Sequence, residues 1–169
     1  MTLVAPAAPK LFATLNSLPE PTRIRVVALL NQRLADAIDL QAQCKQAHWN
    51  VKGPQFIALH KLFDEVHEAV AGHVDLIAER VVQLGGVAAG TVRLAAQASE
   101  LEEYPLVVGT GMDHVRLLAA ALGAFGSRIA ATIRELDGLG DAGSTDLCTE
   151  VSRGIDQWLW FVEAHRQTH

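Results

Sequence analysis

Proline and glycine fall almost entirely between long stretches that carry apolar residues at helical spacing. Proline lacks the backbone N–H that a helix needs, and glycine is a weak helix former, so both residues mark helix ends. The pattern predicts four long helices, over about residues 21–52, 55–84, 112–136 and 145–166. The two-residue alternation typical of strands appears nowhere convincingly, so we expect an all-α fold.

The segment between the second and third predicted helices, residues 90–109, is too long for a simple hairpin. It has a short helical pattern over residues 92–99 and is broken at Pro105. A helix bundle with one such long connection has a crossover there. We therefore predict an all-α bundle of four helices with a short helix in the crossover. We expect one domain over residues 21–169, preceded by a flexible tail over residues 1–20.

Composition narrows the class of protein. A chain of 169 residues that is 50% apolar can bury one real core but is short for two domains. A net charge of -5 argues against an electrostatic nucleic-acid binder. Cys44 and Cys148 are isolated, which does not fit a disulfide framework or a zinc knuckle. We see no signal-peptide pattern and no apolar stretch near the roughly 20 residues of a bilayer span, so we expect a soluble, cytoplasmic protein.

The second predicted helix has two distinct faces at about 100° per residue. One gathers apolar residues and should face the bundle core: Phe63, Val66, Val70, Ile77, Val81 and Leu84. The other mixes metal-ligand types with small residues: His60, Asp64, His67, Ala71, Asp75, Ala78 and Glu79. An ordinary surface of an acidic protein also collects carboxylates, so any one of these residues alone is weak evidence for a site.

Two pairs on this second face have the spacing of metal half-sites. His60 and Asp64 are four residues apart, as are Asp75 and Glu79, so each pair projects from adjacent turns. The pairs lie about 22 Å apart along the helix, so one chain cannot close one centre with both. An antiparallel copy of the helix, related by a two-fold axis, would bring the pairs together and make two equivalent sites. His48, which precedes the turn at residues 53–54, would be a third ligand beside His60.

Imidazole and carboxylate ligands suit Fe(II), Zn(II) or Mn(II). Iron is the redox-active choice, and zinc could substitute for it. Trp49 would supply an apolar wall or an electron close to the centre. The alternative for Trp49 is an ordinary core or interface aromatic.

The chain resembles the Dps mini-ferritins over residues 48–53, 56–65 and 75–86, and again in the last helix over residues 155–161. The match reproduces the residue types and the intervals between the five metal-site positions of that family. It implies a hollow homododecamer of four-helix subunits. It also implies a ferroxidase that prefers hydrogen peroxide to oxygen, with a site built by His48, His60 and Asp64 of one subunit and Asp75 and Glu79 of its two-fold mate. The Glu-x-x-His motif of classical ferritins is absent from the sequence.

Several other residues are open to two interpretations. Glu65 and Glu68 would nucleate mineral inside a shell, or be solvated surface residues. An acidic three-fold pore, implied by the same resemblance, would be lined by Asp137, Asp141, Asp146 and Glu150, although Asp146 could simply favour a helix N-terminus. His67 would be an extra ligand or, more simply, a packed interface residue.

The sequence is compatible with three functions from different classes. The first is a ferroxidase and iron store that protects against oxidative damage. The second is a DNA-binding nucleoid protein, which the charge disfavours: twelve subunits at -5 each carry -60 and should repel phosphates, so we expect weak or absent DNA binding. The third is a cage that binds zinc or manganese without catalysis, using the same ligands.

Overall fold

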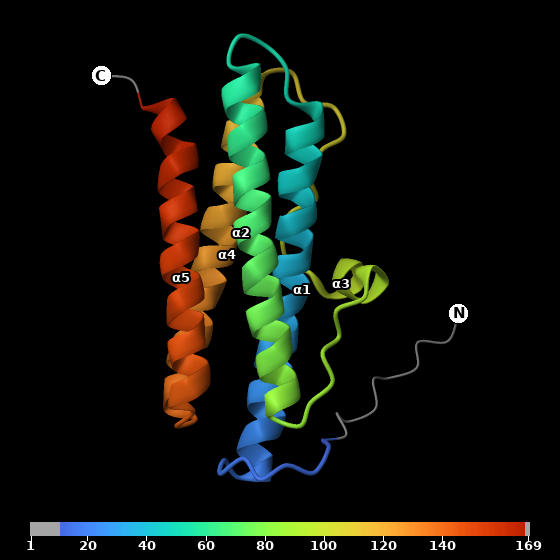
Figure 1. Ribbon diagram of the computed structural model, residues 1–169, viewed down its shortest axis with the longest axis vertical. Coiled ribbons are helices and arrows are strands. Elements are labelled where there is room, and N and C mark those ends of the chain that lie inside the picture. The colour runs from blue at the N-terminus through green and yellow to red at the C-terminus, as the bar shows by residue number, and fades with distance from the viewer. Residues whose placement is uncertain (1–10, 168–169) are drawn as a thin grey trace.

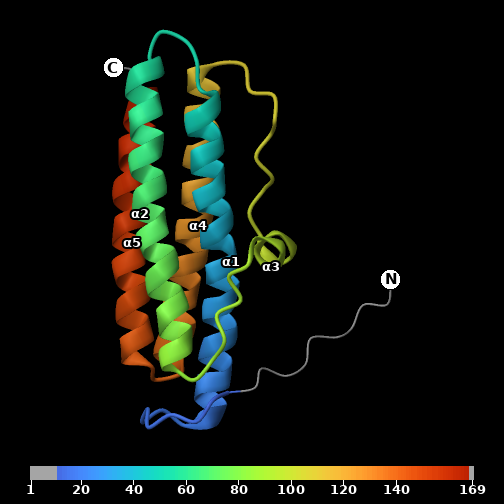
Figure 2. The same ribbon diagram turned by 45° about the vertical axis from the view of Figure 1, so that its right-hand side comes forward.

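A computed structural model describes residues 11–167, and over this range the chain is all-α (Figure 1). The structure confirms four long helices and a short helix in the crossover. Their bounds are α1 Glu20–Asn50, α2 Phe56–Gln83, α3 Val92–Ala98, α4 Gly111–Gly138 and α5 Ala142–Glu163, followed by the short 3-10 turn η1 Ala164–Arg166. α1 and α2 form one hairpin and α4 and α5 the other. The crossover runs from one end of the bundle to the other outside α1, with α3 beside that helix (Figures 1 and 2).

The predicted core face of α2 is confirmed, because all six of its apolar residues are fully buried. Residues from α1 and α4 complete the core, with Leu30, Leu34, Leu118 and Phe125 among its largest fully buried side chains. Both cysteines are free and belong to this core. Burial raises the pKa of the Cys44 thiol to about 12 and that of the Cys148 thiol to about 11. Both thiols are therefore protonated packing residues at neutral pH.

α5 begins earlier than predicted, at Ala142 rather than near Thr145. The Oδ1 of Asp141 accepts a hydrogen bond from the backbone N–H of Ser144 at 3.1 Å, which caps the helix. Gly143, which the sequence suggested was a loop residue, lies inside the helix against Arg80. A Cβ at Gly143 would lie 2.9 Å from the Arg80 guanidinium, so a larger residue there would require the end of the Arg80 side chain to shift.

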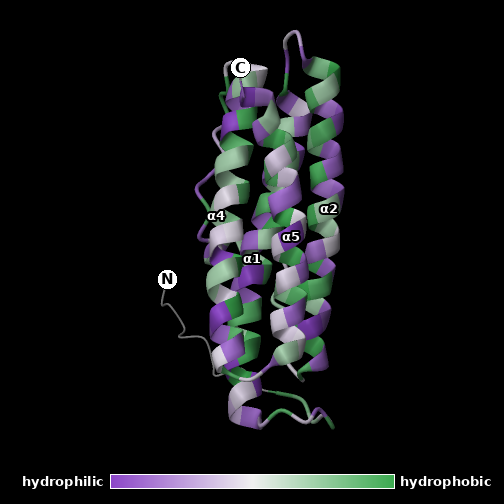
Figure 3. Ribbon diagram, turned by 90° about the vertical axis from the view of Figure 1, so that its left-hand side faces the viewer, coloured by the Kyte–Doolittle hydropathy of each residue, from purple (hydrophilic) through white to green (hydrophobic). Residues whose placement is uncertain are grey.

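The sequence suggested that no apolar stretch is long enough to cross a bilayer, but α4 is long and apolar enough to do so by length and composition alone. The helix also buries Val115, Leu118, Leu122 and Ile129 in the bundle core. Figure 3 shows the apolar and polar residues of the helices mixed along their length. A core helix of a bundle meets the same criteria of length and composition, so α4 alone is no argument for a membrane span.

The predicted flexible tail spans residues 1–20, of which residues 1–10 lie outside the described residues. Residues 11–19 run beside the start of α1 and the end of α2. The backbone N–H of Phe12 donates to the Gly85 carbonyl at 2.7 Å, and the Arg23 guanidinium donates to the carbonyls of Leu18 and Leu84. Gly85 has a φ of +84°, a backbone conformation that glycine adopts without strain. The flexibility of residues 1–20 stays a prediction.

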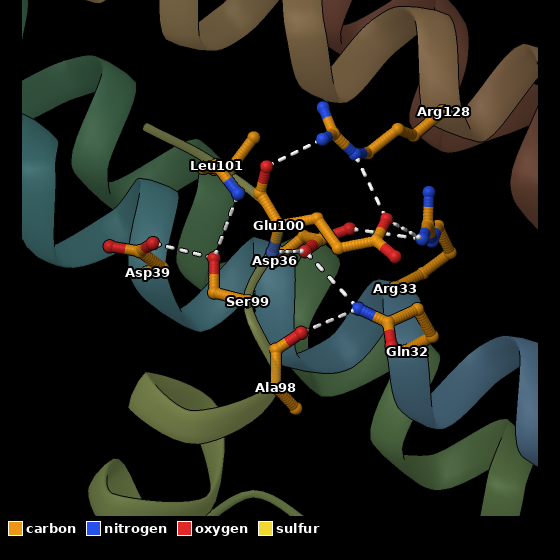
Figure 4. Close-up of polar contacts among 9 residues, drawn as sticks. All are labelled: Gln32, Arg33, Asp36, Asp39, Ala98, Ser99, Glu100, Leu101 and Arg128. Carbon is orange, nitrogen blue, oxygen red and sulfur yellow. Dashed lines mark hydrogen bonds and ion pairs between the residues drawn. The ribbon is translucent and has the colours of Figure 1, made fainter. Parts of the chain in front are cut away.

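Polar contacts from α1 hold the crossover where it leaves α3 (Figure 4). The Asp36 carboxylate accepts the backbone N–H of Glu100 at 2.8 Å, and the Asp39 carboxylate accepts the Ser99 hydroxyl at 2.6 Å. Arg33 of α1 and Arg128 of α4 both contact the Glu100 carboxylate at 3.2 Å. These contacts join α1, the crossover and α4.

Asp36 is the most deeply buried charged group in this set, with no exposed surface. Burial raises its pKa, and the Glu100 backbone hydrogen bond and the Arg33 charge only partly offset that effect. Its Oδ2 lies 3.2 Å from the Arg33 guanidinium but has no hydrogen bond of good geometry. The charge of Asp36 therefore costs desolvation energy that its partners do not fully return.

Candidate metal centre

The first predicted half-site lies where α1 and α2 meet. A short turn with Gly53 at a φ of +106° reverses the chain, and so the end of α1 lies beside the start of α2. As a result the rings of His48 and His60 stack, with centroids 3.8 Å apart and an interplanar angle of 22°. The structure thus confirms that His48 lies within reach of His60.

The two imidazoles are oriented by reciprocal hydrogen bonds. The Nδ1 of His48 lies 2.7 Å from the His60 carbonyl oxygen, and the Nδ1 of His60 lies 2.9 Å from the His48 carbonyl oxygen. A carbonyl can only accept, so each Nδ1 carries the proton and donates. The Nε2 of each ring is left as the nitrogen that can meet a metal. A metal-binding histidine needs this arrangement, in which one ring nitrogen donates to a fixed partner and the other meets the metal.

Asp64 is the third member of this half-site. Its Oδ1 lies 3.8 Å from the His48 Nδ1 and contacts the Nζ of Lys45 on α1. The hydrogen bond from Lys45 holds the pKa of the Asp64 carboxyl below its usual range, and the positive charges nearby add to the effect. Asp64 is therefore ionised at neutral pH, but its charge is already paired to a lysine.

The second predicted half-site lies further along α2. Asp75 and Glu79 are both exposed, and neither carboxylate has a hydrogen-bond or ion-pair partner among residues 11–167. Eleven residues separate Asp64 from Asp75, a rise of about 16 Å along the helix. Over the described part of the chain, no three His, Cys, Asp or Glu side chains are arranged to hold one metal ion. The structure therefore brings His48, His60 and Asp64 together and leaves Asp75 and Glu79 apart from them.

An exposed apolar residue lies beside the second half-site. Val82, one turn after Glu79, is 58% exposed. Ala78, Glu79 and Val82 line a shallow depression of about 380 Å³. A carboxylate beside an exposed valine and a shallow depression is a surface that another protein chain can cover.

Trp49 is 67% exposed, which excludes its interpretation as a core aromatic. It follows His48 in the last turn of α1 and lines a cavity of about 610 Å³ between α1 and the crossover, together with Ile38, Ala42, Leu101 and Tyr104. An interface aromatic and a residue that acts near the site both remain compatible with this position.

The remaining candidates on α2 differ in how firmly they are held. Glu65 and Glu68 are exposed. The Nδ1 of His67 donates to the Gln41 carbonyl of α1 at 3.0 Å, so its Nε2 is free in the same way as that of the two stacked histidines. His67 is therefore fixed on the face that was predicted to meet a second subunit.

One of the four residues predicted to line an acidic pore does not fit that role. Asp141 is only 2% exposed, and its carboxylate binds the Arg80 guanidinium at 2.9 Å and the Ser144 hydroxyl at 2.5 Å. The pore assignment of Asp141 is wrong, because a carboxylate paired in the interior of one subunit cannot line a channel between subunits. Asp137, Asp146 and Glu150 are exposed, and their pore role stays a prediction.

Sequence reasoning missed three polar residues near the first half-site. Lys45 lies three residues before His48, so its place on the same face of α1 could have been found from spacing. Tyr104 and His114 are joined by a hydrogen bond of 2.5 Å between the phenol oxygen and the imidazole Nδ1. They come from the crossover and from α4, and no local pattern in the sequence indicates that they meet.

Comparison with known proteins places this geometry in a family context. The ferritin-like domain model matches residues 27–168. The DNA protection during starvation protein of Agrobacterium fabrum is 42% identical over 158 residues, which are 94% of this chain and 98% of the relative. Among solved structures, DpsA14 from Streptomyces coelicolor is similar with a TM-score of 0.90 and 29% identity, covering 96% of each chain. Mycobacterium smegmatis Dps is similar with a TM-score of 0.88 and 29% identity, covering 93% of this chain and 94% of that one.

Proposed function

The chain belongs to the Dps family of ferritin-like proteins, and from that premise we propose that it oxidises Fe(II) at sites shared between two subunits and stores the ferric product. Family membership supports a role in iron storage and protection. The ferroxidase activity, its preference for hydrogen peroxide, the homododecamer and a cytoplasmic location are our proposals for this chain.

The stacked histidines carry the proposal. Two imidazoles with rings fixed through Nδ1, beside an ionised carboxylate, are a ligand set for a divalent first-row metal. Asp75 and Glu79 of a two-fold mate would complete the set with hard oxygen ligands, which also suit the Fe(III) product. Their lack of partners among residues 11–167 leaves both carboxylates available for a metal shared with another subunit.

The reaction balances with two iron ions at one such site. Two Fe(II) each give one electron to one hydrogen peroxide, which takes up two protons and becomes two water molecules. The carboxylates neutralise the positive charge that grows as both irons become Fe(III). Since both electrons reach peroxide together, no hydroxyl radical is released.

Complementation between two inactive variants tests the shared site. We would prepare Asp64→Asn and Glu79→Gln separately, add Fe(II) and peroxide, and follow ferric absorbance. Each variant alone should oxidise iron slowly. In mixed dimers one of the two sites contains both changes and the other contains neither, so activity should return to part of the wild-type value. If mixing restores nothing, the half-sites do not come from different chains.

The name of the Agrobacterium fabrum relative, a DNA protection during starvation protein, makes DNA binding the second candidate function. The net charge of -5 still predicts weak or absent binding by this chain at neutral pH. A gel shift at low and moderate salt tests this, and a tight complex at neutral pH would overturn the prediction. A cage that holds zinc or manganese without catalysis would bind metal yet give no ferric product on addition of iron and peroxide.

A further inference from the structure

Tyr104 and His114 form a buried pair that the proposed ferroxidase site does not use. The phenol oxygen lies 2.5 Å from the imidazole Nδ1, and the two rings are nearly parallel with centroids 6.0 Å apart. Tyr104 is 9% exposed and His114 is 2% exposed. Tyr104 is the only tyrosine in the sequence.

The direction of the hydrogen bond follows from the surroundings of both groups. Burial lowers the pKa of His114, so its ring is neutral at pH 7, and the backbone of Asn50 is a second hydrogen-bond partner of the imidazole. Burial raises the pKa of Tyr104, so the phenol keeps its proton. The phenol therefore donates, and Nδ1 of His114 is an open acceptor for that proton.

The pair lies at the same end of the bundle as the first half-site. The start of α4 packs against the α1–α2 turn, since a Cβ on Gly111 would lie 2.9 Å from Leu59 and 3.2 Å from the Lys52 carbonyl. The ring of His114 packs on Phe63, the residue before Asp64, with centroids 6.5 Å apart. Tyr104 lines the same cavity as Trp49, the residue after His48.

We propose that Tyr104 and His114 are a redox site at which the phenol gives up one electron while its proton moves to His114. Loss of an electron alone would leave a positively charged phenol in a poorly solvated place, which is costly. Transfer of the proton along an existing short hydrogen bond avoids that state. The product is a neutral tyrosyl radical beside an imidazolium, and burial shields the radical from solvent.

A role for this site follows if the chain is a ferroxidase, and this step rests on the proposed function. When a site holds a single Fe(II), peroxide takes one electron from it and yields Fe(III), hydroxide and a hydroxyl radical. Tyr104 gives one electron to that radical, which becomes hydroxide, and the phenol proton passes to His114. A second Fe(II) then reduces the tyrosyl radical, and the proton returns to the phenol oxygen. The sum is two Fe(II) oxidised and one peroxide reduced.

The redox site is tested first without iron. The full chain is mixed with a ruthenium(II) polypyridyl complex and peroxodisulfate, and a light pulse generates the ruthenium(III) oxidant. We expect a tyrosyl radical by electron paramagnetic resonance and optical absorbance in the wild type, and none in Tyr104→Phe, which removes only the hydroxyl. Trp160→Phe, which changes an exposed aromatic on α5, is the matched control and should keep the signal.

The proton acceptor is tested by rate. In His114→Gln the amide can still pack and hydrogen-bond but cannot take the proton, so radical formation should slow by roughly 100-fold, the contribution of a positioned base. In the wild type the rate should fall in heavy water. The proposal is overturned if the signal is absent in wild type, if it persists in Tyr104→Phe, or if neither His114→Gln nor heavy water changes the rate. Folding of His114→Gln is checked by its helical content in circular dichroism. The rate of radical formation by the wild type in heavy water tests the proton transfer without that variant.

A second measurement separates this site from the ferroxidase proposal. With limiting Fe(II) and peroxide, a spin trap should detect several times more hydroxyl radical from Tyr104→Phe than from wild type, and fewer Fe(II) ions should be oxidised per peroxide. Radical formation with ruthenium but no excess of trapped radical with iron would support the redox site and reject its role in iron oxidation. Failure of the photochemical test with normal iron oxidation would reject the redox site and leave the ferroxidase proposal standing.

Discussion

The ammonium of Lys45 lies against the Oδ1 of Asp64, so a carboxylate of the proposed metal site is already paired to a cation supplied by the neighbouring helix. The side chains are 26% and 41% exposed, respectively. Lys45 therefore both keeps Asp64 ionised and competes with any metal for the same oxygen.

Removing the Lys45 charge should strengthen metal binding. Lys45→Met keeps the length of the side chain but frees Asp64, so we expect Zn(II) or Co(II) to bind a few-fold more tightly, since partly exposed ion pairs contribute little. Isothermal titration calorimetry measures the change. Lys61→Met, which removes an exposed lysine from α2, should leave the affinity unchanged. Weaker binding in Lys45→Met would mean that the lysine supports the site rather than competes for it.

The pKa of the Asp64 carboxyl should depend on Lys45. The pKa of this carboxyl is lowered in the folded chain, chiefly by the Lys45 hydrogen bond. The ionised carboxylate therefore contributes to stability above the pKa of the unfolded chain, and this contribution is lost as the pH falls through the pKa of the folded chain. In Lys45→Met the pKa should rise toward the usual range. Carbon-detected nuclear magnetic resonance of the carboxyl groups gives both values. An unchanged Asp64 titration would show that the contact does not persist in solution.

The contribution of Asp36 to stability should change with pH in the opposite direction. Burial raises its pKa, so the folded chain holds this proton more tightly than the unfolded chain does. Its contribution to stability should therefore fall as the pH rises from the unfolded pKa to the raised value. Urea unfolding across mildly acidic pH should show this slope in wild type and lose it in Asp36→Asn.

A second change at Asp36 separates its hydrogen bond from its charge. Asp36→Ala leaves the partly buried Glu100 N–H without its carboxylate acceptor, which should cost about 1 kcal/mol at neutral pH. The free energy of unfolding in urea measures that cost. Equal stability of Asp36→Ala and wild type would mean that the crossover does not depend on this bond.

Substitutions at Asp141 and Asp146 should distinguish a residue that stabilises the fold from one that acts in iron entry. Asp141→Ala removes the α5 cap and leaves Arg80 without its buried partner, so we expect a loss of about 2–4 kcal/mol in unfolding free energy. Asp146→Ala changes an exposed residue and should leave stability unchanged. Thermal unfolding measures the first effect, and the rate of iron uptake into the assembled protein measures any pore effect of Asp146. Loss of stability in Asp146→Ala but not in Asp141→Ala would reverse these assignments.

Features set by interactions within one segment were predicted more accurately than features set by contacts between distant segments. Helix positions and the buried face of α2 were predicted well because they depend on spacing within one segment. The start of α5 was missed because Gly140 and Gly143 suggested a loop, although Asp141 caps the helix through the backbone N–H of Ser144. The choice between a core and an interface aromatic at Trp49 stayed open because no local pattern shows which side of α1 is uncovered.

The sequence by itself determined the four helices, the crossover and the two pairs of candidate ligands on one face of α2, because a helix repeats every 3.6 residues whatever surrounds it. Only the tertiary structure decided that His48 and His60 stack with each Nδ1 bound to a backbone carbonyl, that Lys45 holds Asp64, and that Tyr104 meets His114. Hydrogen bonds between separate elements depend on distances of a few tenths of an ångström, and these are set by how the helices pack against one another.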